Sequence, residues 1–379
     1  MRRPLLSRIY LIRFRQVLAI TVVWMLLAAL DVVNSLAIWE GALSIRVQPD
    51  SLGQALMLAL VGAGLAGLLS GGLLVFFLRE RFRRLPFGLT VLLNSGLVSL
   101  LNAGITLAVL LLAARWMPSS RPDAPLLGQL LHQPGPGMLL RHYLFWLLLA
   151  VLTIFALHVN EKYGPGVLRE LILGKYHHPR QEERIFMFLD VKGSTVLAER
   201  LGHLQFHSLL NTYYRDITIP IINSEGEIYQ YVGDMIVVSW SMEKGLHHAN
   251  CVRCFYRVME TVQRNANRYR ELYGVVPEFK AGLHCGEVTT GEIGVIKKDI
   301  VYSGDVLNTT ARIQSICNKF RVKILLSKYL LEKLNLPPHG FLPKRMGVIE
   351  LKGKRQKVEL YTFQESMDVE QLPPVLSNP

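Results

Sequence analysis

Cysteine is scarce in this chain of 379 residues, which has four, all of them after residue 250. Cys251 and Cys254 form a C-x-x-C pair within a predicted helix, but no second pair stands at metal-binding spacing. No pattern of a redox fold accompanies the pair. We therefore expect buried structural thiols rather than a zinc or redox site on these residues.

Charge is almost absent from long stretches of the first 160 residues. Three of four apolar stretches contain no Lys, Arg, Asp or Glu, and the first contains only Asp31. Each is close to the roughly 20 residues that cross a bilayer. Buried helices of a soluble protein would require four consecutive helices with almost no polar face. We therefore predict spans at Val17–Trp39, Gln54–Leu78, Leu89–Ala114 and Tyr143–Asn160.

Basic residues outnumber acidic ones at the N-terminus and between the second and third predicted spans. The first 15 residues hold five Arg and no Asp or Glu, and "RERFRR" between spans two and three holds four more Arg. By the positive-inside rule, the N-terminus and everything after span four are cytoplasmic, at a plasma (inner) membrane. The net charge of +13 then indicates attraction to anionic lipid in the bilayer, and we expect no nucleic-acid partner.

The predicted spans contain a few polar residues and one pair of closely spaced glycines. Because polar groups are costly in lipid, we expect them to face the bundle interior. Gly67 and Gly71 have the small-x-x-x-small spacing that allows close helix approach, which we assign to packing within the bundle. The polar residues are Asp31, Asn34, Asn94 and Asn102.

The composition changes after residue 160, which predicts a second domain. Residues 161–183 read as a linker in which Gly164-Pro165-Gly166 breaks any helix leaving span four. The linker is either a passive tether or a signalling element, and the sequence favours neither. The predicted organisation is a transmembrane domain 1–160, this linker, a catalytic domain 184–365 and a tail 366–379.

The second half alternates strand and helix patterns in a regular order. Its core order of β-α-β-β-α-β predicts an α+β, ferredoxin-like sheet with a C-terminal extension. The predicted elements are a strand 184–191, a helix 194–222 with a Ser/Thr cap, a hairpin 226–240, a helix 247–274, a strand and loop 278–294, a helix 304–320, a strand–helix 322–334 and two strands within 341–363.

Two carboxylates stand at ends of these strands. Asp190 ends the first strand, and Asp234 tips the central hairpin. In a split β-α-β-β-α-β sheet, the first strand and the hairpin lie side by side, so the two side chains converge. Taken singly, Asp190 or Asp234 could be a helix-cap or turn residue. Together, the paired carboxylates suit a site for two Mg²⁺ ions. The following Gly193, Ser194 and Thr195 open a helix whose N–H groups are a cradle for triphosphate.

These motifs resemble the class III nucleotidyl cyclase catalytic domain over about residues 182–365. The matching stretches, in order, are "FLDVKGST", "YVGDMIVVSW", "EFKAGLHCGEV", "GDVLNTTARI" and "ELKGK". Diguanylate cyclases share the topology, but their signature of two glycines followed by acidic pairs is absent at the hairpin.

The resemblance implies a role for each matching position. Asp190, Asp234 and the Val191 carbonyl would hold two Mg²⁺ or Mn²⁺ ions in each active site. Asn308 would orient the ribose, and Arg312 would neutralise charge on the α-phosphate. These two stand at i and i+4 and so share a helix face. The phosphate-binding lysine of the family matches Lys352, with Lys354 as a possible substitute.

The resemblance also implies a homodimer that converts ATP to 3′,5′-cyclic AMP and pyrophosphate. In this family the metal pair and the Asn/Arg pair come from opposite subunits, and this chain carries both pairs. Gln230 and Val301 occupy the base-recognition positions, where neither the usual adenylyl nor the usual guanylyl pair occurs. We expect ATP, with a guanylate cyclase or a catalytically silent membrane receptor as the alternatives.

Overall fold

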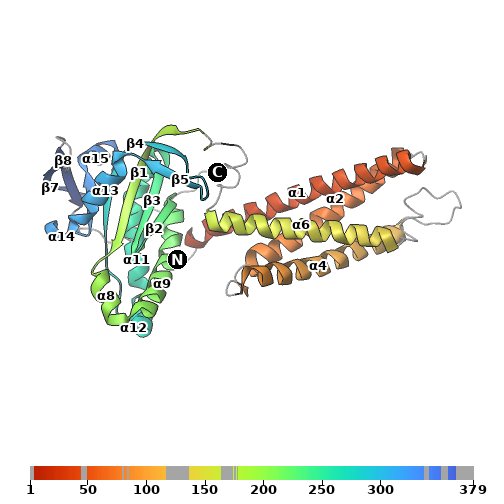
Figure 1. The fold of residues 1–379 in the computed structure, drawn as a ribbon, viewed down its shortest axis with the longest axis horizontal. Helices are drawn as coiled ribbons and strands as arrows, with labels where there is room; N and C mark the ends of the chain where they lie inside the picture. The colour runs from red at the N-terminus through yellow and green to blue at the C-terminus, as the bar shows by residue number, and fades with distance from the viewer. Residues whose placement is uncertain are drawn as a thin grey trace. The chain divides into compact units, whose positions relative to one another are not determined.

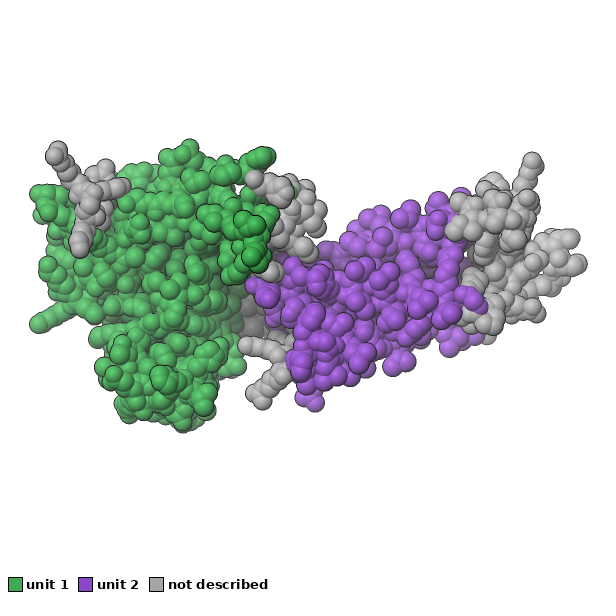
Figure 2. Space-filling model, in the orientation of Figure 1, with its two compact units in different colours: residues 1–9, 169–379 green, residues 10–168 purple. Residues whose placement is uncertain are grey.

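The chain divides into two compact units, one formed by residues 10–168 and the other by residues 1–9 and 169–379 (Figure 2). The computed structural model describes residues 4–43, 49–78, 81–82, 85–116, 136–163, 174, 176, 178–336, 341–350 and 357–363. Most of the predicted linker, the Lys352 and Lys354 positions and the tail lie outside these residues.

The N-terminal unit consists of long apolar helices. All four are long and apolar enough to cross a membrane, as the sequence predicted, over Tyr10–Ser35, Leu52–Leu78, Phe87–Val109 and Leu140–Lys162. Large apolar side chains such as Leu26, Leu100 and Leu148 are exposed on them, as in helices that face lipid. The helices are α1 (Pro4–Leu43), α2 (Pro49–Gly72) continued by the π-helix η1 (Leu73–Leu78), α4 (Phe87–Trp116) and α6 (Pro136–Tyr163).

Polar side chains within this unit mostly turn inward. Asn94 and Asn102 are buried, as expected, and the Ser70 hydroxyl donates a hydrogen bond of 2.7 Å to Asn102 Oδ1. Asp31 is half-buried and pairs with Arg141 at 2.9 Å. The expectation was wrong for Asn34, which is exposed, because the turn of α1 carries it to the outer side of the helix.

Gly67 marks a close approach between α1 and α2. A Cβ atom at this position would lie 2.6 Å from Thr21 Cα, which real Cβ atoms do not tolerate. A Cβ at Gly71 would stand 3.5 Å from Ile20 and Val17, an ordinary contact. The small residues therefore serve packing within the bundle, as the sequence predicted.

The C-terminal unit is built on one eight-stranded sheet in the order β2-β3-β1-β4-β6-β8-β7, with β5 paired to β4 (Figure 1). The pairs β2–β3, β3–β1 and β1–β4 are all antiparallel, which confirms the predicted ferredoxin-like core. The strands are β1 (Arg180–Val191), β2 (Glu227–Val232), β3 (Met235–Ser241), β4 (Phe279–Ile293), β5 (Asp299–Ser303), β6 (Ile324–Ser327), β7 (Pro343–Glu350) and β8 (Lys357–Phe363).

The helices cover the two faces of the sheet differently. Alternate β1 residues Ile185, Met187 and Leu189 pack in the main core with α9 and α11, whereas Phe186 and Phe188 pack on the face of α13 (Figure 1). The helices of this unit are α8 (Ser194–Leu201), α9 (His203–Asn223), α10 (Met242–Leu246), the 3-10 turn η2 (His247–Ala249), α11 (Asn250–Arg264), α12 (Ala266–Tyr273), α13 (Asp305–Ser315), α14 (Cys317–Phe320) and α15 (Lys328–Lys333).

All four cysteines are free and buried, so the prediction of structural thiols is confirmed. Burial raises the pKa of the Cys254, Cys285 and Cys317 thiols to about 12. These thiols stay protonated at neutral pH and behave as small apolar side chains.

Several predicted elements differ in detail from the observed ones. The helix predicted over 194–222 is broken at Gly202, whose φ is 75°, and its cap is Gly193 without any side-chain cap bond, so the Ser/Thr cap was wrong. The next long helix breaks at Asn265, whose side chain bonds the Thr261 carbonyl and competes with the helix. The stretch predicted as strand and loop is the single strand β4, because β5 pairs along its second half.

We predict that Gly67→Ala destabilises the helical unit by about 1–3 kcal/mol, because the added methyl group meets the α1 backbone. The measurement is the thermal unfolding midpoint of the full chain in detergent, followed by far-UV circular dichroism. Gly72→Ala, on the same helix with nothing within 4 Å of its Cβ, is the control and should not lower the midpoint. Equal midpoints for the two variants would contradict the packing described here.

Candidate active site

The end of β1 and the tip of the β2–β3 hairpin bring two carboxylates together. Asp190 lies opposite Met235, the residue that follows Asp234. Gly233 takes φ 62°, a left-handed conformation that glycine adopts without strain, and so keeps the turn tight. The Tyr214 hydroxyl donates a hydrogen bond of 3.0 Å to the Gly233 carbonyl and fixes the turn to α9.

Two further side chains contact Asp190, and sequence reasoning missed both. Gln314 Nε2 donates a hydrogen bond of 2.8 Å to Asp190 Oδ2, and Lys280 Nζ lies 3.5 Å from the same oxygen. Lys280 is directly opposite Asp190 in the β1–β4 register, so pairing these two strands on paper would have found it. Gln314 gives no such signal, because its contact depends on how α13 packs against the sheet.

The electrostatics of Asp190 follow from these neighbours. Burial raises its pKa, and Asp234 raises it further through a hydrogen bond and charge repulsion, while Gln314 and Lys280 act in the opposite direction. Two carboxylates forced together in this way are stabilised by a cation with oxygen preference.

The helix after β1 begins without a side-chain cap. Gly193, with φ 68°, precedes α8, and among the described residues no side-chain cap bond is formed at this position. Ser194 and Thr195 form its first turn and are half-buried and exposed, respectively. Such a helix N-terminus favours anionic oxygens such as those of a phosphate.

Asn308 and Arg312 lie on α13, the helix that also carries Gln314. Gln314 is buried against the sheet, whereas Asn308 is exposed and Arg312 half-buried. Within the described parts of the chain, no hydrogen bond or ion pair joins Asn308 or Arg312 to Asp190 or Asp234. The structure thus brings the two carboxylates together and leaves the Asn/Arg pair on a different side of the helix.

The comparisons with known proteins decide the family. The family model described as the adenylate and guanylate cyclase catalytic domain matches residues 177–365. This part of the chain belongs to that family. A solved bacterial light-regulated adenylyl cyclase shares the fold of this cyclase domain, with a TM-score of 0.50, 22% identity, and coverage of 60% of this chain and 67% of its own.

The names of two curated relatives of the cyclase domain refer to different nucleotides. Adenylate cyclase 2 of Rhizobium meliloti is 38% identical over 210 residues, which are 55% of this chain and 58% of the relative. A receptor-type guanylate cyclase of Caenorhabditis elegans is 28% identical over 153 residues, 39% of this chain and 15% of the relative. The match therefore spans little more than half the length of the former and a small part of the latter.

The residues of the cyclase domain fit a divalent cation. Asp190 and Asp234 offer carboxylate oxygens from a paired strand and a tight turn, which are rigid supports. Among the described residues, no group of three or more His, Cys, Asp or Glu side chains is placed to hold a metal ion. Main-chain and phosphate oxygens would therefore complete the shell of Mg²⁺ or Mn²⁺, and the Val191 carbonyl stays a predicted ligand.

Two further predicted positions lie on β2 and β5. Gln230 is exposed on β2, and Val301 is half-buried on β5, next to the β4 residue Gly291.

We predict that Asp190→Asn removes the response of the protein to divalent cations without destabilising it. Because its pKa is raised, Asp190 binds its proton more tightly in the folded state than in the unfolded chain. The ionised carboxylate therefore opposes folding at neutral pH. Asn removes this penalty and keeps an oxygen for Gln314. Without metal, the unfolding midpoint at pH 7 should equal or exceed that of the wild type.

The decisive measurement is the midpoint with and without Mn²⁺, since a ligand of the folded state raises it. The wild type and the control Glu350→Gln, which changes an exposed carboxylate on β7, should both show the rise. A rise of wild-type size in Asp190→Asn would show that Asp190 does not bind the ion.

Proposed function

We propose that the chain is a membrane-bound adenylate cyclase that converts ATP to 3′,5′-cyclic AMP and pyrophosphate. The observation that carries the proposal is the contact between Asp190 and Asp234 in a cyclase domain that also retains Asn308 and Arg312. The 38% identity to an adenylate cyclase favours ATP. We retain the predicted boundaries of 1–160, 161–183, 184–365 and 366–379 as part of the proposal.

The reaction joins the ribose 3′-oxygen to the α-phosphorus. The bond from that phosphorus to the bridging oxygen of pyrophosphate breaks, and the hydroxyl proton leaves to solvent. Bound Mg²⁺ or Mn²⁺ ions would acidify the 3′-hydroxyl and neutralise the leaving pyrophosphate. Asp190, Asp234 and the Val191 carbonyl would hold them.

The other residues bind and orient the substrate. The N–H groups at Gly193, Ser194 and Thr195 would bind phosphate oxygens. Lys280, whose Nζ lies 3.5 Å from Asp190 Oδ2, would contact the same phosphates.

Three further positions would act from other parts of the chain. Asn308 would orient the ribose, and Arg312 would stabilise charge on the α-phosphate. Lys352 would bind phosphate.

A homodimer would account for the separation of the Asp190–Asp234 pair from the Asn308–Arg312 pair. Asn308 and Arg312 are turned away from the sheet while Gln314 on the same helix contacts Asp190. A second copy would therefore supply Asn308 and Arg312 to the Asp190–Asp234 site, and a two-fold dimer would contain two such sites.

The four apolar helices support attachment to a bilayer. From the excess of Arg at the N-terminus and between the second and third spans, we propose that both the N-terminus and the cyclase domain are cytoplasmic, at the plasma or inner membrane. Nucleic acid is not an expected partner, because the basic residues gather beside the spans.

A guanylate cyclase is the second candidate. Gln230 both donates and accepts hydrogen bonds, so its amide suits either purine edge. A silent receptor is disfavoured, because a module that only binds nucleotide has no need of Asp190, Asp234, Asn308 and Arg312 together.

An activity assay of the full chain in detergent or proteoliposomes, with ATP or GTP and with Mg²⁺ or Mn²⁺, tests the proposal. We expect cyclic AMP as the main product and its loss in Asp234→Ala. Cyclic GMP as the main product would favour the second candidate, and no cyclic product from either nucleotide would reject both cyclase functions.

We predict that two inactive variants restore activity when they are mixed. Asp190→Ala damages the metal-binding half of a site, and Arg312→Ala damages the half that contains Asn308 and Arg312. A mixed dimer still contains one site in which both halves are intact. With random exchange of subunits, about a quarter of wild-type activity should return. Mixing Asp190→Ala with Asp234→Ala is the control, because both variants damage the same half-site. Recovery in the control, or none in the test mixture, would argue against shared sites.

A further inference from the structure

A β-bulge in β2 controls the direction of Gln230. Ile228 lies opposite Val238, and Gln230 lies opposite Val237, so Tyr229 is an extra residue between them. Side chains directly opposite in an antiparallel pair share a face. Gln230 therefore shares the face of Val237, and Tyr229 packs on that same face.

This face is the one that carries the carboxylate site. Val237 packs with Phe186 and Phe188 of β1, and Asp190 follows two residues later on the same side of the strand. Without the bulge, strict alternation from Ile228 would turn Gln230 toward the opposite face, the main core.

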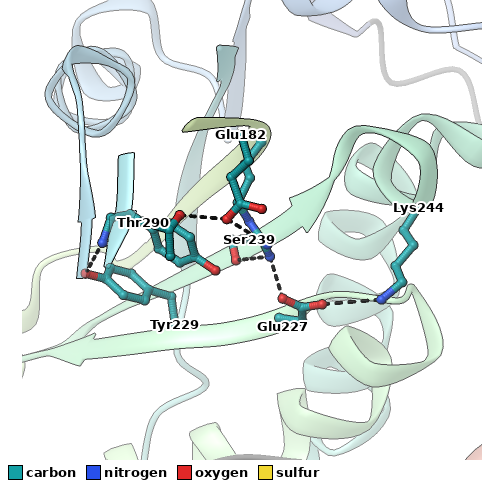
Figure 3. A network of polar contacts seen from close by, with 8 residues as sticks. Glu182, Glu227, Tyr229, Ser239, Lys244 and Thr290 are labelled. Atoms are coloured by element: carbon teal, nitrogen blue, oxygen red, sulfur yellow. Dashed lines mark hydrogen bonds and ion pairs between the residues drawn. The ribbon is translucent and has the colours of Figure 1, made fainter. Parts of the chain in front are cut away.

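Tyr229 also forms a bridge across the sheet. Its hydroxyl oxygen accepts a hydrogen bond of 3.2 Å from the Tyr302 backbone N–H (Figure 3). The two rings meet edge to face with centroids 4.8 Å apart. The strands β2 and β5 are not sheet neighbours, since β3, β1 and β4 lie between them. The Tyr229–Tyr302 bridge is thus a tertiary contact that fixes these two strands to each other.

A buried arginine, Arg184, contacts the ring of Tyr302 in the bridge. The Arg184 guanidinium lies 4.9 Å from the Tyr302 ring, and Arg184 pairs with Glu227 at the start of β2. Arg184 also donates a hydrogen bond of 3.0 Å to Ser239 on β3. Figure 3 shows this network reaching from Lys244, which pairs with Glu227, to the β5 backbone. Networks of this kind hold buried elements in one arrangement.

We propose that the Tyr229–Tyr302 bridge is a positioning element for base recognition. This inference rests on the proposed cyclase function. The bridge residues are the immediate neighbours of Gln230 and Val301, so the bridge sets how far apart these base-recognition positions lie. The hydrogen bond to the Tyr229 hydroxyl also keeps the Tyr302 backbone N–H from donating to a bound base. A free N–H beside the base would favour an acceptor, such as guanine O6, over the amino group at adenine C6.

The test is Tyr229→Phe in the full chain, which keeps the ring and removes the hydrogen-bond acceptor. We expect the KM for ATP to rise more than kcat falls. The ratio of kcat/KM for ATP to that for GTP should drop about 3- to 10-fold, the effect of one hydrogen bond. The ratio does not depend on the fraction of folded enzyme, so partial unfolding does not mask the result.

Tyr329→Phe is the matched control. Its hydroxyl donates a hydrogen bond of 3.1 Å to Glu183 on β1, outside the bridge, so the nucleotide ratio should stay at the wild-type value. The binding of non-cyclisable 3′-deoxy ATP and GTP analogues gives a second readout without turnover.

The outcomes separate this inference from the proposed function. An active wild type with the same nucleotide ratio in Tyr229→Phe and Tyr329→Phe would overturn the bridge and leave the cyclase function intact. A wild type that makes no cyclic nucleotide would overturn the cyclase function itself.

Discussion

The close approach of Asp190 and Asp234 is the constraint that the fold of the cyclase domain has to maintain. Two carboxylates do not stay together unless the backbone forces them to, and here β1 is held between β3 and β4 while Gly233 closes the hairpin. The Gln314 amide and the Lys280 ammonium offset part of the charge. A bound cation, as proposed, would relieve the remaining repulsion, and the paired strands would keep the two carboxylates in place for it.

Helix α13 links the carboxylates to the residues that a partner subunit would use. A Cβ at Gly282 would lie 2.4 Å from the Gln314 backbone nitrogen, so this glycine lets the helix pack directly on β4. The same packing directs Gln314 to Asp190 and leaves Asn308 and Arg312 on other sides of the helix. In a two-fold dimer, any shift of α13 would act on both active sites at once, because one helix contributes to each.

The sequence predicted those features whose signals are local. Hydropathy located the four spans, and the strand pattern placed Asp190 beside the hairpin that carries Asp234. Features that depend on packing were not predictable in this way. Gln314 reaches Asp190 only through the position of α13, and the break at Gly202 depends on a backbone conformation that the helical pattern of the flanking residues conceals. The bulge at Tyr229 interrupts the alternation of side chains between the two faces of β2, and the sequence of this strand gives no sign of the interruption.

Base selectivity illustrates why residue identity at a motif position is an incomplete guide. Gln230 reaches the active-site face because one extra residue stands before it, and the hydroxyl of that residue takes up the Tyr302 N–H. A chain with the same glutamine but without the bulge would direct the amide into the core. Under the proposed function, recognition of the purine would depend on strand register and on a tertiary contact as much as on the side chain. Comparisons between cyclases should therefore include the residue before the base-reading position.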